Sequence, residues 1–359
     1  MISDSPHHDW ETLSRRIKAW GIELGLDAIG IADGELTLAE AHLEAWLAAG
    51  RHGDMDYMAR HGRKRSRPAQ LLPGTLRVIS ARLDYLPESQ ERSQRLLQEP
   101  ETAFISRYAL GRDYHKVLRK RLQQLAERIR SAIDGGSFRV FVDSAPVLEK
   151  PLAEKAGLGW IGKHTNLLTR DAGSWFFLGE IYTDLPLIPD SPASSHCGRC
   201  RACIDICPTR AIVAPYQLDA RLCISYLTIE LKGAIPEPLR AAIGNRIYGC
   251  DDCQQVCPWN RFAKLTRERD FLPRHGLDSA ALITLLDWSE AEFLDRTAGS
   301  AIRRLGHERW LRNLAVALGN TPGSPAVVEA LQRRLDHPSA LVREHVAWAL
   351  ARQRNFQPA

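Results

Sequence analysis

Eight cysteines constrain this chain more than any other feature, because all of them fall between residues 197 and 257 of 359. The first four stand in CGRCRACIDICP, whose spacing C-x2-C-x2-C-x3-C-P is that of bacterial ferredoxins. In such a run, three thiolates hold one [4Fe-4S] cluster and the fourth cysteine ligates a second cluster. The run therefore predicts two clusters and a partner run elsewhere in the chain.

The partner run is CDDCQQVCP, residues 250–258, which has the tail of the ferredoxin pattern but one cysteine too few at its head. Cys223 stands alone between the two runs and is the cysteine left to complete the second set. We therefore predict two clusters with exchanged ligands. The first takes Cys197, Cys200, Cys203 and Cys257, and the second takes Cys207, Cys223, Cys250 and Cys253.

Two other uses of the cysteines fit less well. Zinc sites usually pair C-x2-C units across a longer spacer. A disulfide framework is typical of small secreted domains and is disfavoured in a reducing cytosol. The start, MISDSPHHDW, has neither a basic segment nor an apolar one, so we expect a cytoplasmic location. No stretch approaches the roughly 18 apolar residues of a membrane span, so we expect no membrane partner.

Before the cysteines, helical and extended patterns alternate. Apolar residues recur at helical spacing over 10–20 and 114–129. Segments 77–85, 138–143 and 174–182 are rich in branched and aromatic residues and predict strands. This mixture predicts an α/β or α+β domain that is large enough to enclose a cofactor or substrate.

After about residue 263, helix-sized apolar repeats dominate. Segment 308–320 predicts a helix, and 324–353 predicts two helices of about a dozen residues, the second capped by Ser339. Such a pair resembles a HEAT repeat, although a plain helical cap over the cluster unit is the alternative. We therefore predict an α+β multidomain chain: an N-terminal α/β domain (1–187), a bacterial-type two-cluster ferredoxin domain (188–262) and a HEAT-like α-helical domain (263–359).

The formal charge of +5 is modest, but two basic clusters stand out. Such clusters can follow a phosphate backbone, or they can be solvated faces without a partner. The first comprises Arg60, Arg63, Lys64, Arg65 and Arg67, and the second comprises Arg303, Arg304, Arg309 and Arg312.

The order of these parts resembles that of the epoxyqueuosine reductase family over essentially the whole chain. The residues that carry the resemblance are SRYALGRDYH (106–115), VDSAPVLEKPLAEKAGLGWIGKHTNLL (142–168), CGRCRACIDICPT (197–209), CISYLTIELKG (223–233) and YGCDDCQQVCPWN (248–260). The resemblance implies a cobalamin in the N-terminal domain and two [4Fe-4S] clusters. It also implies reduction of epoxyqueuosine to queuosine in a tRNA anticodon loop, with electrons from an external donor, and we expect a monomer.

The resemblance also implies roles for individual residues. Asp143 falls on the position of the family's proton donor, and we expect a low-dielectric pocket to raise its pKa. Asp113-Tyr-His115 begins like a cobalt-ligating motif, but Leu118 stands where glycine belongs, so we expect His115 to be only a residue of the first helical turn. Cobalamin contacts are expected at Lys163, Thr165, Asn166, Ser225 and Gly249, and substrate contacts at Arg107, Tyr108 and Lys232.

Two other functions remain open at this point. Reductive dehalogenases also pair cobalamin with two clusters, and they typically carry export signals. The other alternative is an electron-transfer protein whose N-terminal domain has no chemistry of its own. The HEAT-like tail favours a macromolecular substrate.

Overall fold

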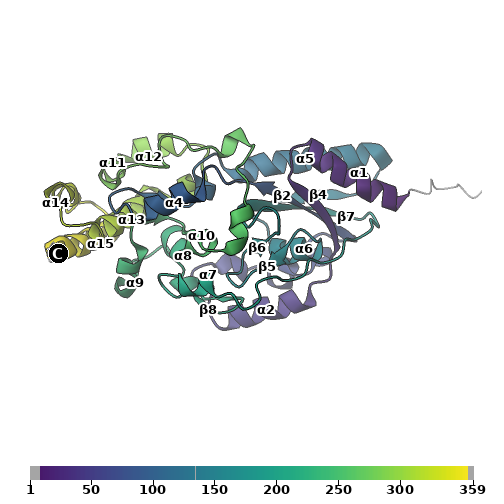
Figure 1. Cartoon of the computed structure of the whole chain (residues 1–359), viewed down its shortest axis with the longest axis horizontal. Coiled ribbons are helices and arrows are strands. Elements are labelled where there is room, and N and C mark those ends of the chain that lie inside the picture. The colour runs from purple at the N-terminus through teal and green to yellow at the C-terminus, as the bar shows by residue number, and fades with distance from the viewer. Residues whose placement is uncertain (1–8, 134, 355–359) are drawn as a thin grey trace, which may run out of the picture.

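The computed structural model describes residues 9–133 and 135–354. A sheet flanked by helices lies at one end of its long axis, and a group of helices lies at the other end (Figure 1). The cysteine-rich segment lies between them, so it contacts both.

The sheet has four antiparallel strands in the order β1-β2-β7-β4. Side chains alternate across it, as the pleat requires: Ile79, Ala81 and Leu83 face one hydrophobic core, and Val78 faces another. The strands are β1 (Ala28–Asp33), β2 (Arg77–Asp84), β4 (Phe138–Phe141) and β7 (Phe176–Thr183). The predicted strands are confirmed, and β1 was not recognised in the sequence.

Helices cover both faces of this sheet. The predicted helices α1 (Trp10–Glu23) and α5 (Tyr114–Ile133) are confirmed and share one core with it. Helix α6 (Glu149–Lys155) packs on the opposite face, against β1, β2 and β7. The other N-terminal elements are α2 (Thr37–Ala48), α3 (Pro68–Leu71), α4 (Gln90–Leu97), β3 (Phe104–Ile105), β5 (Trp160–Ile161) and β6 (Leu167–Leu168).

The cysteine-rich segment is built from short elements. Two four-residue helices, α7 (Ala202–Asp205) and α10 (Asp252–Gln255), contact each other, and each contains the second cysteine of a C-x2-C pair. The remaining elements are β8 (Ile212–Ala214), β9 (Gln217–Leu218), α8 (Ile224–Ile229), α9 (Glu237–Ile243) and β10 (Arg246–Tyr248). Strand β10 pairs in parallel with β3, which joins this segment to the N-terminal part.

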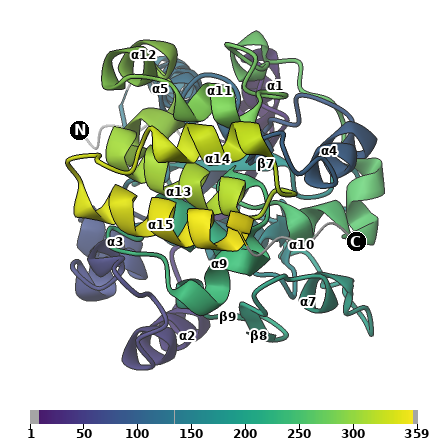
Figure 2. The same ribbon diagram turned by 90° about the vertical axis from the view of Figure 1, so that its left-hand side faces the viewer.

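The C-terminal part is helical, and three of its helices lie side by side (Figure 2). Its elements are α11 (Leu282–Leu286), α12 (Glu290–Arg296), the 3-10 helix η7 (Ala301–Leu305), α13 (His307–Gly319), α14 (Pro325–Gln332) and α15 (Ala340–Arg354). The Ser339 hydroxyl accepts from the Val342 N–H at 3.3 Å, so the predicted cap is confirmed. Helix α14 has eight residues, shorter than the predicted dozen.

The helical part is not packed as an independent unit. Its core includes Ala103, Ile105, Ala109 and Leu110, which come from the N-terminal third of the sequence. Segment 103–110 therefore connects the sheet, the cysteine-rich segment and the tail. Within the two described ranges, no helix is both long and apolar enough to cross a membrane.

Candidate active site and iron–sulfur centres

The structure gathers the four cysteines predicted for the first cluster around one cavity. This cavity of about 240 Å³, here called the outer cysteine site, is lined by Cys197, Cys200, Cys203 and Cys257 together with Lys163, His164 and Trp259. Cys200 is exposed and Cys203 is buried. Four thiols around a volume of this size fit a cluster, in which the ligands surround a body larger than one ion.

His164 provides a further observation that fits a cluster in the outer cysteine site. Burial and the charge of Lys150 lower the pKa of His164 to about 4, so its ring is neutral at pH 7. Its Nδ1 accepts from the Asn166 N–H at 3.1 Å, which leaves the proton on Nε2. Nε2 is buried without a partner in the described structure. Such an N–H is suited to a cluster sulfur, an interaction that tunes cluster potential.

Lys163 belongs to the same place. Its ammonium donates to the carbonyls of Gly198 at 2.7 Å and Cys200 at 2.8 Å. These bonds fix the ligand loop and put a positive charge beside the outer cysteine site. The cobalamin contact expected at Lys163 stays a prediction.

The other four cysteines, Cys207, Cys223, Cys250 and Cys253, are the predicted ligands of the second cluster and are here called the inner cysteine site. Burial raises the pKa of the Cys253 thiol well above its usual value, and the neighbouring Cys223 and Cys207 raise it further. The Cys250 thiol donates to Asp252 at 2.8 Å, and Arg246 pairs with the same carboxylate. Cys203 also acts on Cys253, so the two sites adjoin.

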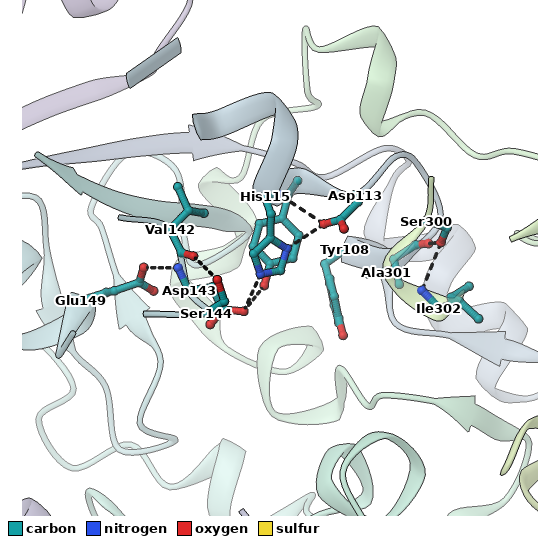
Figure 3. Close-up of polar contacts among 12 residues, drawn as sticks. Tyr108, Asp113, His115, Val142, Asp143, Ser144, Glu149, Ser300, Ala301 and Ile302 are labelled. Atoms are coloured by element: carbon teal, nitrogen blue, oxygen red, sulfur yellow. Dashed lines mark hydrogen bonds and ion pairs between the residues drawn. The ribbon is translucent and has the colours of Figure 1, made fainter. Parts of the chain in front are cut away.

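Asp143 lies two residues after the end of β4, where the backbone takes the left-handed value φ +47°. Its N–H donates to Glu149 Oε1 at 2.6 Å, in the first turn of α6. Its Oδ2 accepts from the Tyr114 hydroxyl at 2.5 Å and lies 3.2 Å from His115 Nε2 (Figure 3). The side chain is 51% exposed, so the carboxylate is held in place yet open to a ligand.

His115 lies between two carboxylates (Figure 3). Its Nδ1 is 2.6 Å from Asp113 Oδ1, and its Nε2 faces Asp143. Burial alone would lower the pKa of His115, but the two carboxylates outweigh it and raise the pKa to about 9. The residue is in the first turn of α5, as predicted, but it also holds a proton at the site, which the sequence analysis missed.

The expected pKa shift of Asp143 is corrected by this geometry. Burial would raise the pKa of Asp143, but the hydrogen-bonding partners His115 and Tyr114 lower it below its usual value. The resting aspartate is therefore ionised, and the proton beside it is held by His115.

A pair of carboxyl groups, Glu149 and Glu180, lies next to Asp143. Glu180 of β7 is fully buried, and neither of its oxygens has a hydrogen-bond donor in the described residues. Burial and the charge of Asp143 raise the pKa of Glu149 to about 8, and burial together with Glu149 raises that of Glu180 well above its usual value. Two such groups keep at least one proton between them at neutral pH.

Asp251, between two cysteines of the inner site, contacts the segment that precedes α5. Asp251 accepts from Ser106 Oγ at 2.5 Å and from the Arg107 N–H at 2.8 Å. The Arg107 side chain is fully buried and pairs with Glu88, which argues against the expected substrate contact. Tyr108 is half-buried with its ring against Tyr114, so it remains beside the site.

The other predicted contacts are dispersed around these elements. Gly249 is buried at φ +72°, and a Cβ there would lie 2.6 Å from Ser106 Cβ, so the close approach requires glycine. The Thr165 carbonyl accepts from Lys150 Nζ at 2.8 Å, while Asn166 closes the same loop by accepting from the Gly162 N–H. Ser225 is half-buried in α8, and Lys232 is exposed after it.

Only some of the side chains in the two basic clusters lie on the surface. Arg65 is buried and donates to the Tyr57 carbonyl, and Arg67 pairs with Glu40. Arg312 is fully buried and donates to the carbonyls of Leu227, Leu231 and Gly233. These three therefore hold the chain together. Arg303 and Arg304 remain exposed on η7, and Arg304 acts electrostatically on Asp113 and Asp143.

Comparison with known proteins identifies two regions of the chain. Residues 65–144 match the family described as epoxyqueuosine reductase QueG, DUF1730, and residues 196–260 match the 4Fe-4S double cluster binding domain. An epoxyqueuosine reductase of Pseudomonas aeruginosa is 66% identical over 342 residues, which cover 95% of this chain and 94% of that protein.

Solved structures give the same result for the fold. A crystal structure of epoxyqueuosine reductase with an epoxyqueuosine-modified tRNA-Tyr stem loop superposes with a TM-score of 0.86 at 29% identity, over 95% of this chain and 90% of that one. A Bacillus subtilis epoxyqueuosine reductase, with its catalytic aspartate loop swung out of the active site, gives 0.87 at 29% identity and the same coverage.

Proposed function

The chain belongs to the epoxyqueuosine reductase family, and we propose how its residues carry out that reaction. The protein is an oxidoreductase that reduces epoxyqueuosine in tRNA and contains a double [4Fe-4S] domain. Conversion of the epoxide to an alkene consumes two electrons and two protons and releases water. The site must therefore deliver electrons and protons to the same carbon–oxygen bonds.

Electrons pass from the outer cysteine site to the inner one, because Cys203 and Cys253 bring the two sites together. Beyond the inner site lies Lys150, whose ammonium interacts with Cys253 on one side and with Asp143 on the other. Asp143, Ser144 and Lys150 are all exposed there, so a cofactor can contact their polar groups. Lys150, Thr165 and Ser144 would hold cobalamin at this place, and cobalamin supplies low-potential cobalt chemistry for the epoxide.

Asp143 delivers the first proton to the epoxide oxygen. It is ionised at rest, so it receives this proton from His115, which is held as an imidazolium between Asp113 and Asp143. A proton in transit then needs to move only from His115 Nε2 to Asp143 Oδ2, a separation of 3.2 Å. Tyr114 fixes the carboxylate from the other side.

Glu149 keeps Asp143 in position. A left-handed residue other than glycine costs about 1–2 kcal/mol, and the bond from the Asp143 N–H to Glu149 offsets this cost. The Bacillus subtilis relative has been captured with its catalytic aspartate loop swung out. We infer the same movement here, with Glu149 stabilising the inward position.

The tRNA contacts are proposed at Arg303, Arg304 and Lys232, which are exposed, and at Tyr108. Arg304 lies close enough to the Asp143 site to interact with it electrostatically. A phosphate held there would place the modified base beside the carboxylate.

The observation that carries the catalytic proposal is the contact of one half-exposed carboxylate with both Tyr114 and His115. The test is Asp143→Asn, because asparagine tolerates the left-handed backbone. We expect turnover to fall on the order of 10²–10⁴-fold, the usual contribution of a general acid, with unchanged iron content and tRNA affinity. Nucleoside analysis of treated tRNA measures the product. A variant within threefold of wild-type activity would refute the role of Asp143.

A further inference from the structure

The outer cysteine site opens to the protein surface. Cys200 is exposed, and so are its neighbours Gly198, Arg199 and Arg201. Pro258 and Arg261 also line the cavity and are exposed. By contrast, Cys207, Cys223, Cys250 and Cys253 of the inner site are each partly covered. An electron from another molecule therefore has its shortest approach at Cys200.

The two chain segments that line this opening are rich in basic residues. Segments 191–210 and 258–267 contribute six basic side chains and one acidic side chain, Asp205, which lies 3.5 Å from Arg201. All six basic residues are exposed: Arg199, Arg201, Arg210, Arg261, Lys264 and Arg267. Lys163 adds a further positive charge at the cavity. The field here favours an acidic partner and speeds its approach.

Apolar groups lie within the same surface. Phe262 is 40% exposed, and its ring lies 6.1 Å from that of Trp259, which lines the cavity. The Arg261 guanidinium lies over the Phe262 ring at 4.5 Å. Aromatic and arginine side chains are the residues that most often anchor protein interfaces. The surface thus combines steering charges with an anchor.

We propose that this surface, defined by Arg199, Arg201, Arg261, Phe262 and Lys264 around Cys200, docks an acidic one-electron carrier protein. The inference rests on the proposed electron path through the two cysteine sites. At each docking, the reduced carrier loses one electron and the outer [4Fe-4S] cluster gains it, with no bond made or broken. Two dockings supply the two electrons that one epoxide consumes.

The charges by themselves would also suit tRNA, but the placement favours a protein. The substrate base must reach Asp143, and an exposed arginine that acts on Asp143 is Arg304 of η7. The cations around Cys200 instead surround a cluster ligand, where an electron donor gains from close approach and an RNA backbone does not.

The test measures how fast the clusters are reduced in the reconstituted, cobalamin-free full chain. Reduced flavodoxin is the acidic carrier, dithionite is the small reductant, and the bleaching of the visible cluster absorption is the signal. We expect Arg199→Glu/Arg261→Glu to slow reduction by flavodoxin at low salt by about tenfold or more. Reduction by dithionite and the affinity for the tRNA stem loop should stay unchanged, and the wild-type rate should fall as salt rises.

The control is Arg119→Glu/Lys120→Glu, which reverses two exposed charges on α5 and should leave the flavodoxin rate unchanged. Lys264→Glu repeats the test farther from the ligand loops if the double variant loses iron. A normal flavodoxin rate in both variants overturns the proposal, and weakened tRNA binding instead identifies the surface as an RNA contact. Failure of the electron path itself looks different: the clusters bleach normally, but the complete enzyme forms no product.

Discussion

The two cysteine sites share a sequence pattern but have opposite surroundings. The two cysteine runs that supply them each contain a C-x2-C-x3-C-P tail and a four-residue helix, α7 in one run and α10 in the other, and the last cysteine of each run is assigned to the other site. One site presents Cys200 to solvent among exposed arginines, whereas Asp251, next to the ligands of the other, is buried against Ser106 and Arg107. Spacing thus sets which residues can hold a cluster, and packing sets what each cluster is placed to do.

The largest predicted effect separates these two tasks. Cys253→Ala should abolish product formation with every reductant, because it removes the cluster that lies next to the Asp143 site. Cys200→Ala should abolish turnover driven by a carrier protein but retain slow turnover with a small chemical reductant, which does not need the outer opening. Nucleoside analysis and electron paramagnetic resonance of each variant measure both points. If both variants lose activity equally with the small reductant, the outer site is not merely the point of electron entry, and the two sites do not have separate tasks.

Local patterns made much of this architecture predictable. Strand β2 follows from its branched and aromatic residues, helix α5 follows from its apolar spacing, and the double-cluster domain follows from the cysteine runs. Strand β1, AIGIAD, was not recognised because it contains a glycine and few branched or aromatic residues.

The proton site was less predictable, since its partners are distant in sequence. Glu180 meets Glu149 across the interface of α6 and β7, and His115 meets Asp143 from another helix. The burial of Arg312 also depends on distant groups, the carbonyls near the end of α8, which compensate for the loss of water. The sequence analysis placed Arg312 in a basic surface cluster because these backbone partners cannot be recognised in the sequence.

The second prediction concerns Glu149, which contacts Asp143 and does not line the outer cysteine site. Glu149→Ala removes the acceptor of the Asp143 N–H and leaves the left-handed backbone at Asp143 unsupported. Misplacement of a catalytic group by about 1 Å can cost on the order of 10²-fold, so we expect kcat to fall 10- to 100-fold with little change in KM. Hydrogen exchange at residues 142–147 should rise in the same variant. Unchanged exchange with reduced kcat would show that Glu149 acts on the chemistry directly.

The third prediction compares a glycine at each site. Gly249→Ala places a Cβ 2.6 Å from Ser106 Cβ in a left-handed backbone, and should destabilise the protein by roughly 2–5 kcal/mol. Gly198→Ala has the same backbone hand but meets nothing within 4 Å, so it should cost only about 1 kcal/mol. Chemical denaturation of the two variants measures the difference. Equal losses would mean that the inner site is not the more tightly packed one.

The smallest expected effect is in the pH dependence of stability. It arises from Glu149, beside Asp143, and not from the outer cysteine site. The pKa of Glu149 rises from its usual 4.5 to about 8 on folding, so the folded state binds more protons than the unfolded state between these values. Stability contributed by this group is therefore fully present below pH 4.5 and is lost as the pH rises to 8.

Other groups near Glu149 titrate or carry charge as well, so the measurement has to be a difference between proteins. Those acting on it or affected by it are Asp143, Glu180, His115, Tyr114, Tyr182, Lys150 and Arg65. Glu149→Gln removes one carboxyl and should make the free energy of unfolding fall less steeply from pH 5 to pH 8 than in the wild type. Lys163→Gln at the outer site should leave the wild-type slope intact. If both variants flatten the slope of unfolding free energy against pH equally, the titrating proton does not belong to the Glu149/Glu180 pair. The pH dependence then does not distinguish the surroundings of Asp143 from the outer cysteine site.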